Sequence, residues 1–80
     1  MNNNELTAYH EIVTWGWKYF KKYCLDYDAD AALQELRDFV DRYEKGSMLR
    51  EFAFRTAKVA WDEFGRIHER ENNEENQNKP

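Results

Sequence analysis

The sequence predicts an all-α fold: an up-down-up three-helix bundle over residues 1–68, followed by a disordered acidic C-terminal tail over residues 69–80. Three stretches repeat apolar residues at spacings of three and four, which is the period of an amphipathic helix. The links between them are short, and short links make successive helices antiparallel neighbours. From residue 69 onward the chain carries no aliphatic or aromatic side chain and is rich in Asn and Glu, which is typical of disorder.

The first helix is expected at about residues 5–25, after an N-terminal cap at Asn4. At about 100° per residue its apolar side chains cover roughly 200° of arc, wider than the ~100° stripe of an ordinary surface helix. We therefore interpret this helix as the central one. Its apolar side comprises Leu6, Tyr9, Ile12, Val13, Gly16, Phe20, Tyr23, Cys24 and Tyr27, with Trp15 and Tyr19 at one edge and Trp17 at the opposite edge.

The second helix is expected at about residues 29–45 and the third at about residues 48–68. The apolar stripe predicted for the second helix consists of Ala29, Ala32, Leu33, Leu36, Phe39, Val40 and Tyr43. Asp28 and Ser47 have the side chains preferred at helix N-terminal caps. Gly46 is expected to end the second helix, because glycine is the residue that most readily follows a helix C-terminus.

A glycine inside the first helix indicates close packing. Gly16 lies within the apolar arc, where it costs about 1 kcal/mol relative to alanine. Small side chains let two backbones approach, and the buried stripe predicted for the third helix is rich in them: it consists of Leu49, Phe52, Ala53, Thr56, Ala57, Ala60, Phe64 and Ile67. We therefore expect the third helix to cross the first near Gly16, opposite Ala53, Ala57 and Ala60.

Composition limits the classes of function. The chain has 80 residues and a net charge of −4, so it makes one small acidic domain. Acidity weighs against nucleic acid as a partner, because phosphate contacts need Lys and Arg. The sequence lacks an apolar run of membrane-spanning length and a secretory signal pattern, and Cys24 is its only cysteine. We expect a cytoplasmic protein, and its size and charge suggest an origin in a phage or mobile element.

No motif indicates catalysis, so we expect neither an enzyme nor a cofactor or small-molecule substrate. His10 and Cys24 are the types of residue that form a base–nucleophile pair. They are separated by about 21 Å along one helix at 1.5 Å per residue, so they cannot meet. His68 lies near the expected end of the third helix, where helices fray.

The spacing Asp26-x-Asp28-x-Asp30 resembles the opening of a calcium-binding EF-hand loop. The rest of the loop departs from that pattern, because Ala31 stands where glycine is needed and Arg37 where a chelating glutamate should close the site. We therefore interpret the acidic residues as the cap and first turn of the second helix, and we expect no metal site.

Surplus apolar surface is the strongest functional signal. Aromatic side chains lie at the edges of the stripes on the first and third helices, and exposed aromatic patches mark interaction sites. The predicted binding face consists of Trp15, Tyr19, Phe54 and Trp61. We predict that it binds another protein or a second copy of the chain, most simply as a homodimer. The alternative is that these rings lie flat across helix boundaries and complete a small core.

A second hypothesis is a DNA-binding regulator, with the second and third helices arranged as a helix-turn-helix. Its nucleic-acid face would consist of Lys18, Lys21, Lys22, Arg55, Lys58 and Arg66. The simpler interpretation is a solvated face of mixed charge, because acidic residues alternate with these cations on the third helix.

Overall fold

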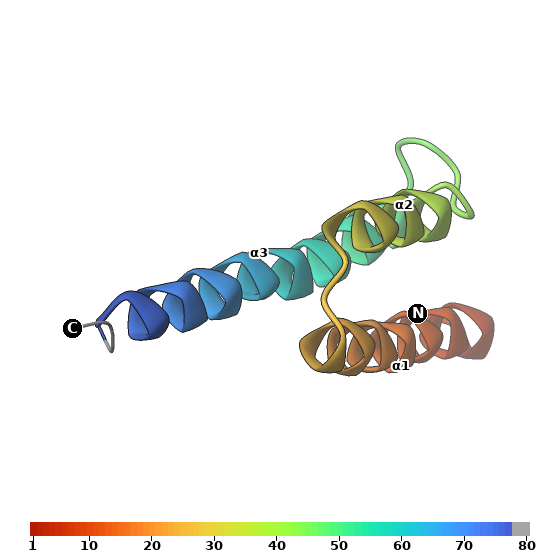
Figure 1. The fold of residues 1–80 in the computed structure, drawn as a ribbon. Helices are drawn as coiled ribbons and strands as arrows, with labels where there is room; N and C mark the ends of the chain where they lie inside the picture. The colour runs from red at the N-terminus through yellow and green to blue at the C-terminus, as the bar shows by residue number, and fades with distance from the viewer. Residues whose placement is uncertain (78–80) are drawn as a thin grey trace.

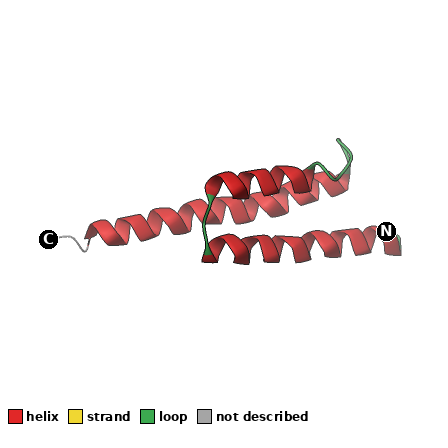
Figure 2. Ribbon diagram, turned by 45° about the vertical axis from the view of Figure 1, so that its right-hand side comes forward, coloured by secondary structure: helices red, strands yellow, loops and turns green. Residues whose placement is uncertain are grey.

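The computed structural model describes the backbone of residues 1–77 and the side chains of residues 1–71. It contains three helices, α1 (Asn3–Leu25), α2 (Ala29–Val40) and α3 (Met48–Gln77), and the described residues form no strand. The ribbon views show α1 and α3 running in the same direction and α2 running back between them in sequence (Figure 1, Figure 2). The prediction of an all-α, up-down-up three-helix bundle is confirmed.

The start of α1 differs from the prediction by a short segment. Asn2 is the N-terminal cap, and its side-chain oxygen accepts a hydrogen bond from the backbone N–H of Glu5 at 2.8 Å. The Asn2 amide donates in return to the Glu5 carboxylate at 3.3 Å. The assignment of Asn4 as the cap is wrong, because this reciprocal pair already satisfies the first turn and leaves Asn4 inside the helix.

The caps of α2 and α3 are those predicted. The Asp28 carboxylate accepts from the Ala31 N–H at 3.1 Å, and the Ser47 hydroxyl accepts from the Arg50 N–H at 3.1 Å. The position of Asp28 supports the interpretation of the three spaced aspartates as a helix start. Gly46 has a φ of +80°, the left-handed conformation that glycine adopts without strain.

α2 ends at Val40 instead of residue 45, and a tertiary contact explains the difference. Arg50 of α3 donates to the Tyr43 carbonyl at 3.0 Å and to the Asp41 carboxylate at 3.1 Å. These bonds hold the chain after Val40 as a turn, where local periodicity alone would have continued the helix.

α3, rather than α1, is the helix against which the other two pack, so the prediction of a central α1 is wrong. The backbones of α1 and α2 stay farther apart from each other than either does from α3. Side-chain size accounts for this asymmetry. Gly16 and the alanines of α3 permit a close approach of α1 and α3, whereas the rings of Trp15 and Tyr19 fill the space between α1 and α2.

The core is formed by one face of each helix. Its buried apolar residues are Ile12, Tyr19, Tyr23, Ala32, Leu36, Phe39, Val40, Ala53, Ala57, Ala60 and Phe64. The stripes predicted for α2 and α3 supply most of this set. On α1 the buried face is rotated toward α2, so that Leu6, Val13 and Cys24, all expected on the apolar side, are exposed.

α3 continues to Gln77, past the end predicted at residue 68. The added segment contains no proline or glycine, and extending an existing helix is much easier than starting one. Residues 69–71 are exposed, and α3 projects beyond the other two helices (Figure 1). Residues 78–80 of the tail predicted to be disordered lie outside the described residues.

Candidate functional site

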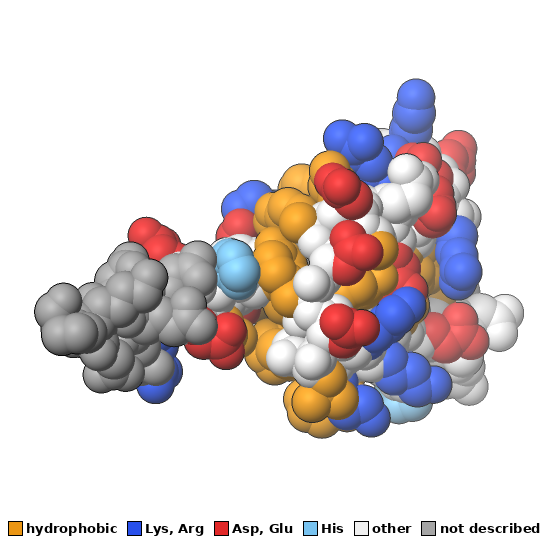
Figure 3. Space-filling view, in the orientation of Figure 1, with side chains coloured by type: hydrophobic (Ala, Val, Ile, Leu, Met, Phe, Trp, Pro, Cys, Tyr) orange, Lys and Arg blue, Asp and Glu red, His pale blue; other side chains and the backbone are white. Residues whose placement is uncertain are grey.

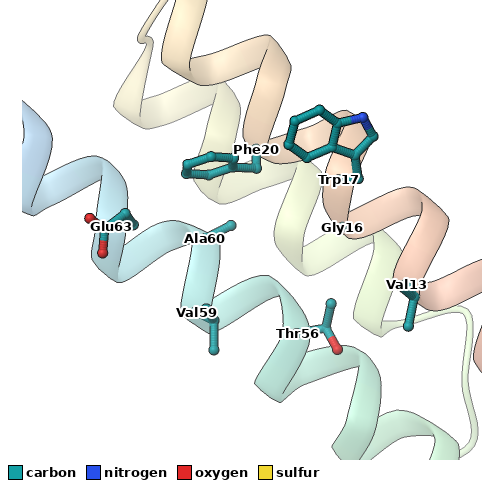
Figure 4. A pocket seen from close by; sticks show the side chains of 8 residues that line it. All are labelled: Val13, Gly16, Trp17, Phe20, Thr56, Val59, Ala60 and Glu63. Carbon is teal, nitrogen blue, oxygen red and sulfur yellow. The ribbon is translucent and has the colours of Figure 1, made fainter.

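α2 covers only one side of the α1–α3 pair, and an apolar groove follows the other side (Figure 4). α1 contributes Val13, Gly16, Trp17 and Phe20. α3 contributes Thr56, Val59, Ala60 and Glu63. We call this site the α1–α3 groove, and its volume is about 300 Å³.

Gly16 forms the floor of the groove. A Cβ atom at this position would lie 2.7 Å from Cγ2 of Thr56, a distance at which one of the two groups must move. The predicted close approach of the helices at Gly16 is therefore present. The nearest neighbour is Thr56, which the sequence had placed on the buried stripe, rather than the alanines, which are buried in the adjacent core.

The apolar side chains on the rims of the groove are unusually exposed. The exposed fraction is 54% for Val13, 60% for Trp17 and 72% for Val59. Phe20 anchors one end, because it stacks on Phe64 of the core with ring centroids 5.8 Å apart. Trp17 lies 6.4 Å from Phe20 and so extends this aromatic row toward solvent.

A second hollow continues the groove toward the start of α1. It has a volume of about 480 Å³, is lined by Leu6, Tyr9 and His10 among others, and shares Val13 with the α1–α3 groove. Leu6 is 60% exposed, and Tyr9 packs edge-on against Phe52 of α3 at 4.9 Å. The exposed apolar surface therefore follows α1 for several turns.

Two of the four predicted interface residues complete the core. Tyr19 is only 2% exposed, and its hydroxyl donates to the Ala32 carbonyl at 2.7 Å. Trp15 stacks on Phe39 of α2 with centroids 3.8 Å apart. Tyr19 therefore lies in the core, as the alternative interpretation expected, because α2 approaches from that edge and its Ala32 carbonyl accepts a hydrogen bond from the buried phenol.

The other two predicted residues lie on the α2 side of α3. Phe54 is 46% exposed and lines a separate hollow with Val40 and Gly46. Trp61 is half-buried against the main core cluster. The structure thus brings the four rings to the borders of α2 and does not gather them on one open face. Whether Phe54 and Trp61 contact a partner stays a prediction.

The residues that line the exposed groove were not predicted as a site, although two signals pointed to it. Trp17 extends the apolar arc of α1 at the edge opposite Tyr19. Val59 is an apolar residue outside the buried stripe of α3. Read together, they mark an apolar edge on each of two neighbouring helices, and Gly16 marks where those helices meet.

Three titratable groups near the core have raised pKa values. Burial raises the pKa of Tyr19, and burial together with Glu35 raises that of Tyr23, so both phenols stay protonated at neutral pH. Desolvation by neighbouring side chains, with Glu63 and Glu71 nearby, raises the pKa of the exposed Cys24 thiol. A thiol held in its protonated form is a poor nucleophile.

The candidate nucleic-acid residues do not form a continuous basic surface. Four pair with carboxylates: Lys22 with Glu35 at 3.3 Å, Arg55 with Glu51 at 2.6 Å, Lys58 with Asp62 at 2.9 Å and Arg66 with Glu63 at 3.6 Å. Figure 3 shows cations and acids interspersed on one face of the molecule. In addition, α2 and α3 lie side by side and antiparallel (Figure 2), whereas helix-turn-helix motifs cross at about 90–120°.

Among the residues whose side chains are described, no three His, Cys, Asp or Glu lie close enough together to hold a metal ion. Within the described residues, none of the three helices has the length and apolar content needed to cross a bilayer. Comparison with protein-family models, with curated proteins and with solved structures finds no match to this chain.

Proposed function

We propose that this chain is a small non-enzymatic interaction domain that binds another protein, or a second copy of itself, through the α1–α3 groove. One observation carries the proposal: three exposed apolar side chains, Val13, Trp17 and Val59, surround a groove of about 300 Å³. Covering such surface is favourable by roughly 25 cal/mol per Å². A hydrophobic patch that spans two helices is typical of an interaction site.

The groove is also built to keep its shape. The contact between Gly16 and Thr56 sets the distance between α1 and α3, and the stacked rings of Phe20 and Phe64 fix one end. A partner would therefore find a preformed site and lose little free energy to reorganisation. Trp17 on the rim is of the residue type most enriched among the residues that dominate binding energy.

The proposal includes a cytoplasmic location, because the only cysteine, Cys24, is free and exposed, as suits a reducing compartment. It differs from the DNA-binding hypothesis in its dependence on salt. DNA affinity falls steeply with ionic strength, whereas association through apolar surface does not. Measurements at low and high salt therefore distinguish the two functions.

The test compares Val59→Glu with Leu25→Glu in the full chain. Both replace an exposed aliphatic residue on a helix with glutamate, but Leu25 lies on the opposite side of α1 from Gly16 at 100° per residue and is 83% exposed. Sedimentation over a concentration series reports self-association. Capture from the source cell reports a foreign partner.

We expect Val59→Glu to lose the association that the wild type shows, and Leu25→Glu to retain it. Circular dichroism and a thermal melt establish that both variants are folded. Association that survives Val59→Glu unchanged, or a wild type with neither self-association nor a retained partner, would overturn the proposal.

A further inference from the structure

We draw no further inference here: the strongest candidate, the exposed apolar surface that follows α1 from Leu6 through the α1–α3 groove to Phe20, belongs to the site already described, and nothing in the structure shows what covers it.

Discussion

The two edges of α1 both carry large apolar side chains, but their environments are opposite. Trp15 and Tyr19 at one edge lie against α2, where Tyr19 is 2% exposed. Val13 and Trp17 at the other edge face solvent beside α3, with more than half of each side chain exposed. The amount of apolar surface on a helix is therefore a property of its own sequence. Which part of it is buried depends on the neighbouring helices.

The size and polarity of the side chains on the neighbouring helices determine which edge of α1 is buried. At the inner edge, α2 offers the Phe39 ring for stacking with Trp15 and the Ala32 carbonyl as an acceptor for the Tyr19 hydroxyl. At the outer edge, the apolar side chains of α3 are short, as at Thr56, Val59 and Ala60, and they leave a groove. The inner edge therefore stabilises the fold, and the outer edge is available for binding.

The largest predicted difference comes from truncating one aromatic ring at each edge. Tyr19→Ala should lower the free energy of unfolding by about 3–5 kcal/mol, because it leaves a cavity in the core. Trp17→Ala should lower it by less than about 1 kcal/mol, because its ring is mostly solvated already. Urea denaturation followed by circular dichroism measures both values. Equal losses would show that the two edges are equally buried in solution.

The second prediction concerns the glycine between the two edges. Gly16→Leu should destabilise the protein by about 1–3 kcal/mol or more, because the larger side chain overpacks the contact with Thr56. Gly65→Ala is the matched control, since a Cβ at Gly65 meets nothing within 4 Å. It should stabilise α3 by roughly 0.5–1 kcal/mol through helix propensity. Thermal melting that shows gains for both variants would mean that α1 and α3 are farther apart at Gly16.

Much of this fold follows from sequence periodicity and local chemistry. The helices, the caps at Asp28 and Ser47, and the buried stripe of α3 all depend on nearby residues and were predicted. The early end of α2 was not, because it depends on hydrogen bonds from Arg50, which belongs to the next helix. Surplus apolar surface was predicted, but the residues predicted to bind, Trp15, Tyr19, Phe54 and Trp61, lie at the borders of α2 rather than in the α1–α3 groove.

The third prediction tests the burial of the Tyr19 hydroxyl at the inner edge through the dependence of stability on pH. Burial raises the pKa of Tyr19 above the value of about 10 expected in the unfolded chain. The unfolded chain then loses its proton first, so stability is fully present below that pH and falls as the pH rises above it. Tyr19→Phe should cost about 1 kcal/mol at neutral pH through the lost hydrogen bond to Ala32, and should reduce the alkaline loss.

Urea denaturation at neutral pH and at about pH 10–11 measures this effect. Tyr23 and Tyr43 also have raised pKa values through burial, so part of the alkaline loss should remain in Tyr19→Phe. An identical alkaline loss in wild type and variant would contradict the buried state of the Tyr19 hydroxyl.

The smallest predicted effect is at the outer edge. Val13→Gln should change the free energy of unfolding by no more than about 0.5 kcal/mol, as is usual for exposed positions. Val13 is 54% exposed, so little buried apolar area is lost, and glutamine has the better helix propensity. The measurement is urea denaturation at a low and a high protein concentration. A loss that appears only at the high concentration would mean that a second copy covers Val13. A loss of more than about 1 kcal/mol at both concentrations would mean that the chain itself closes the groove, and would remove the contrast between the two edges.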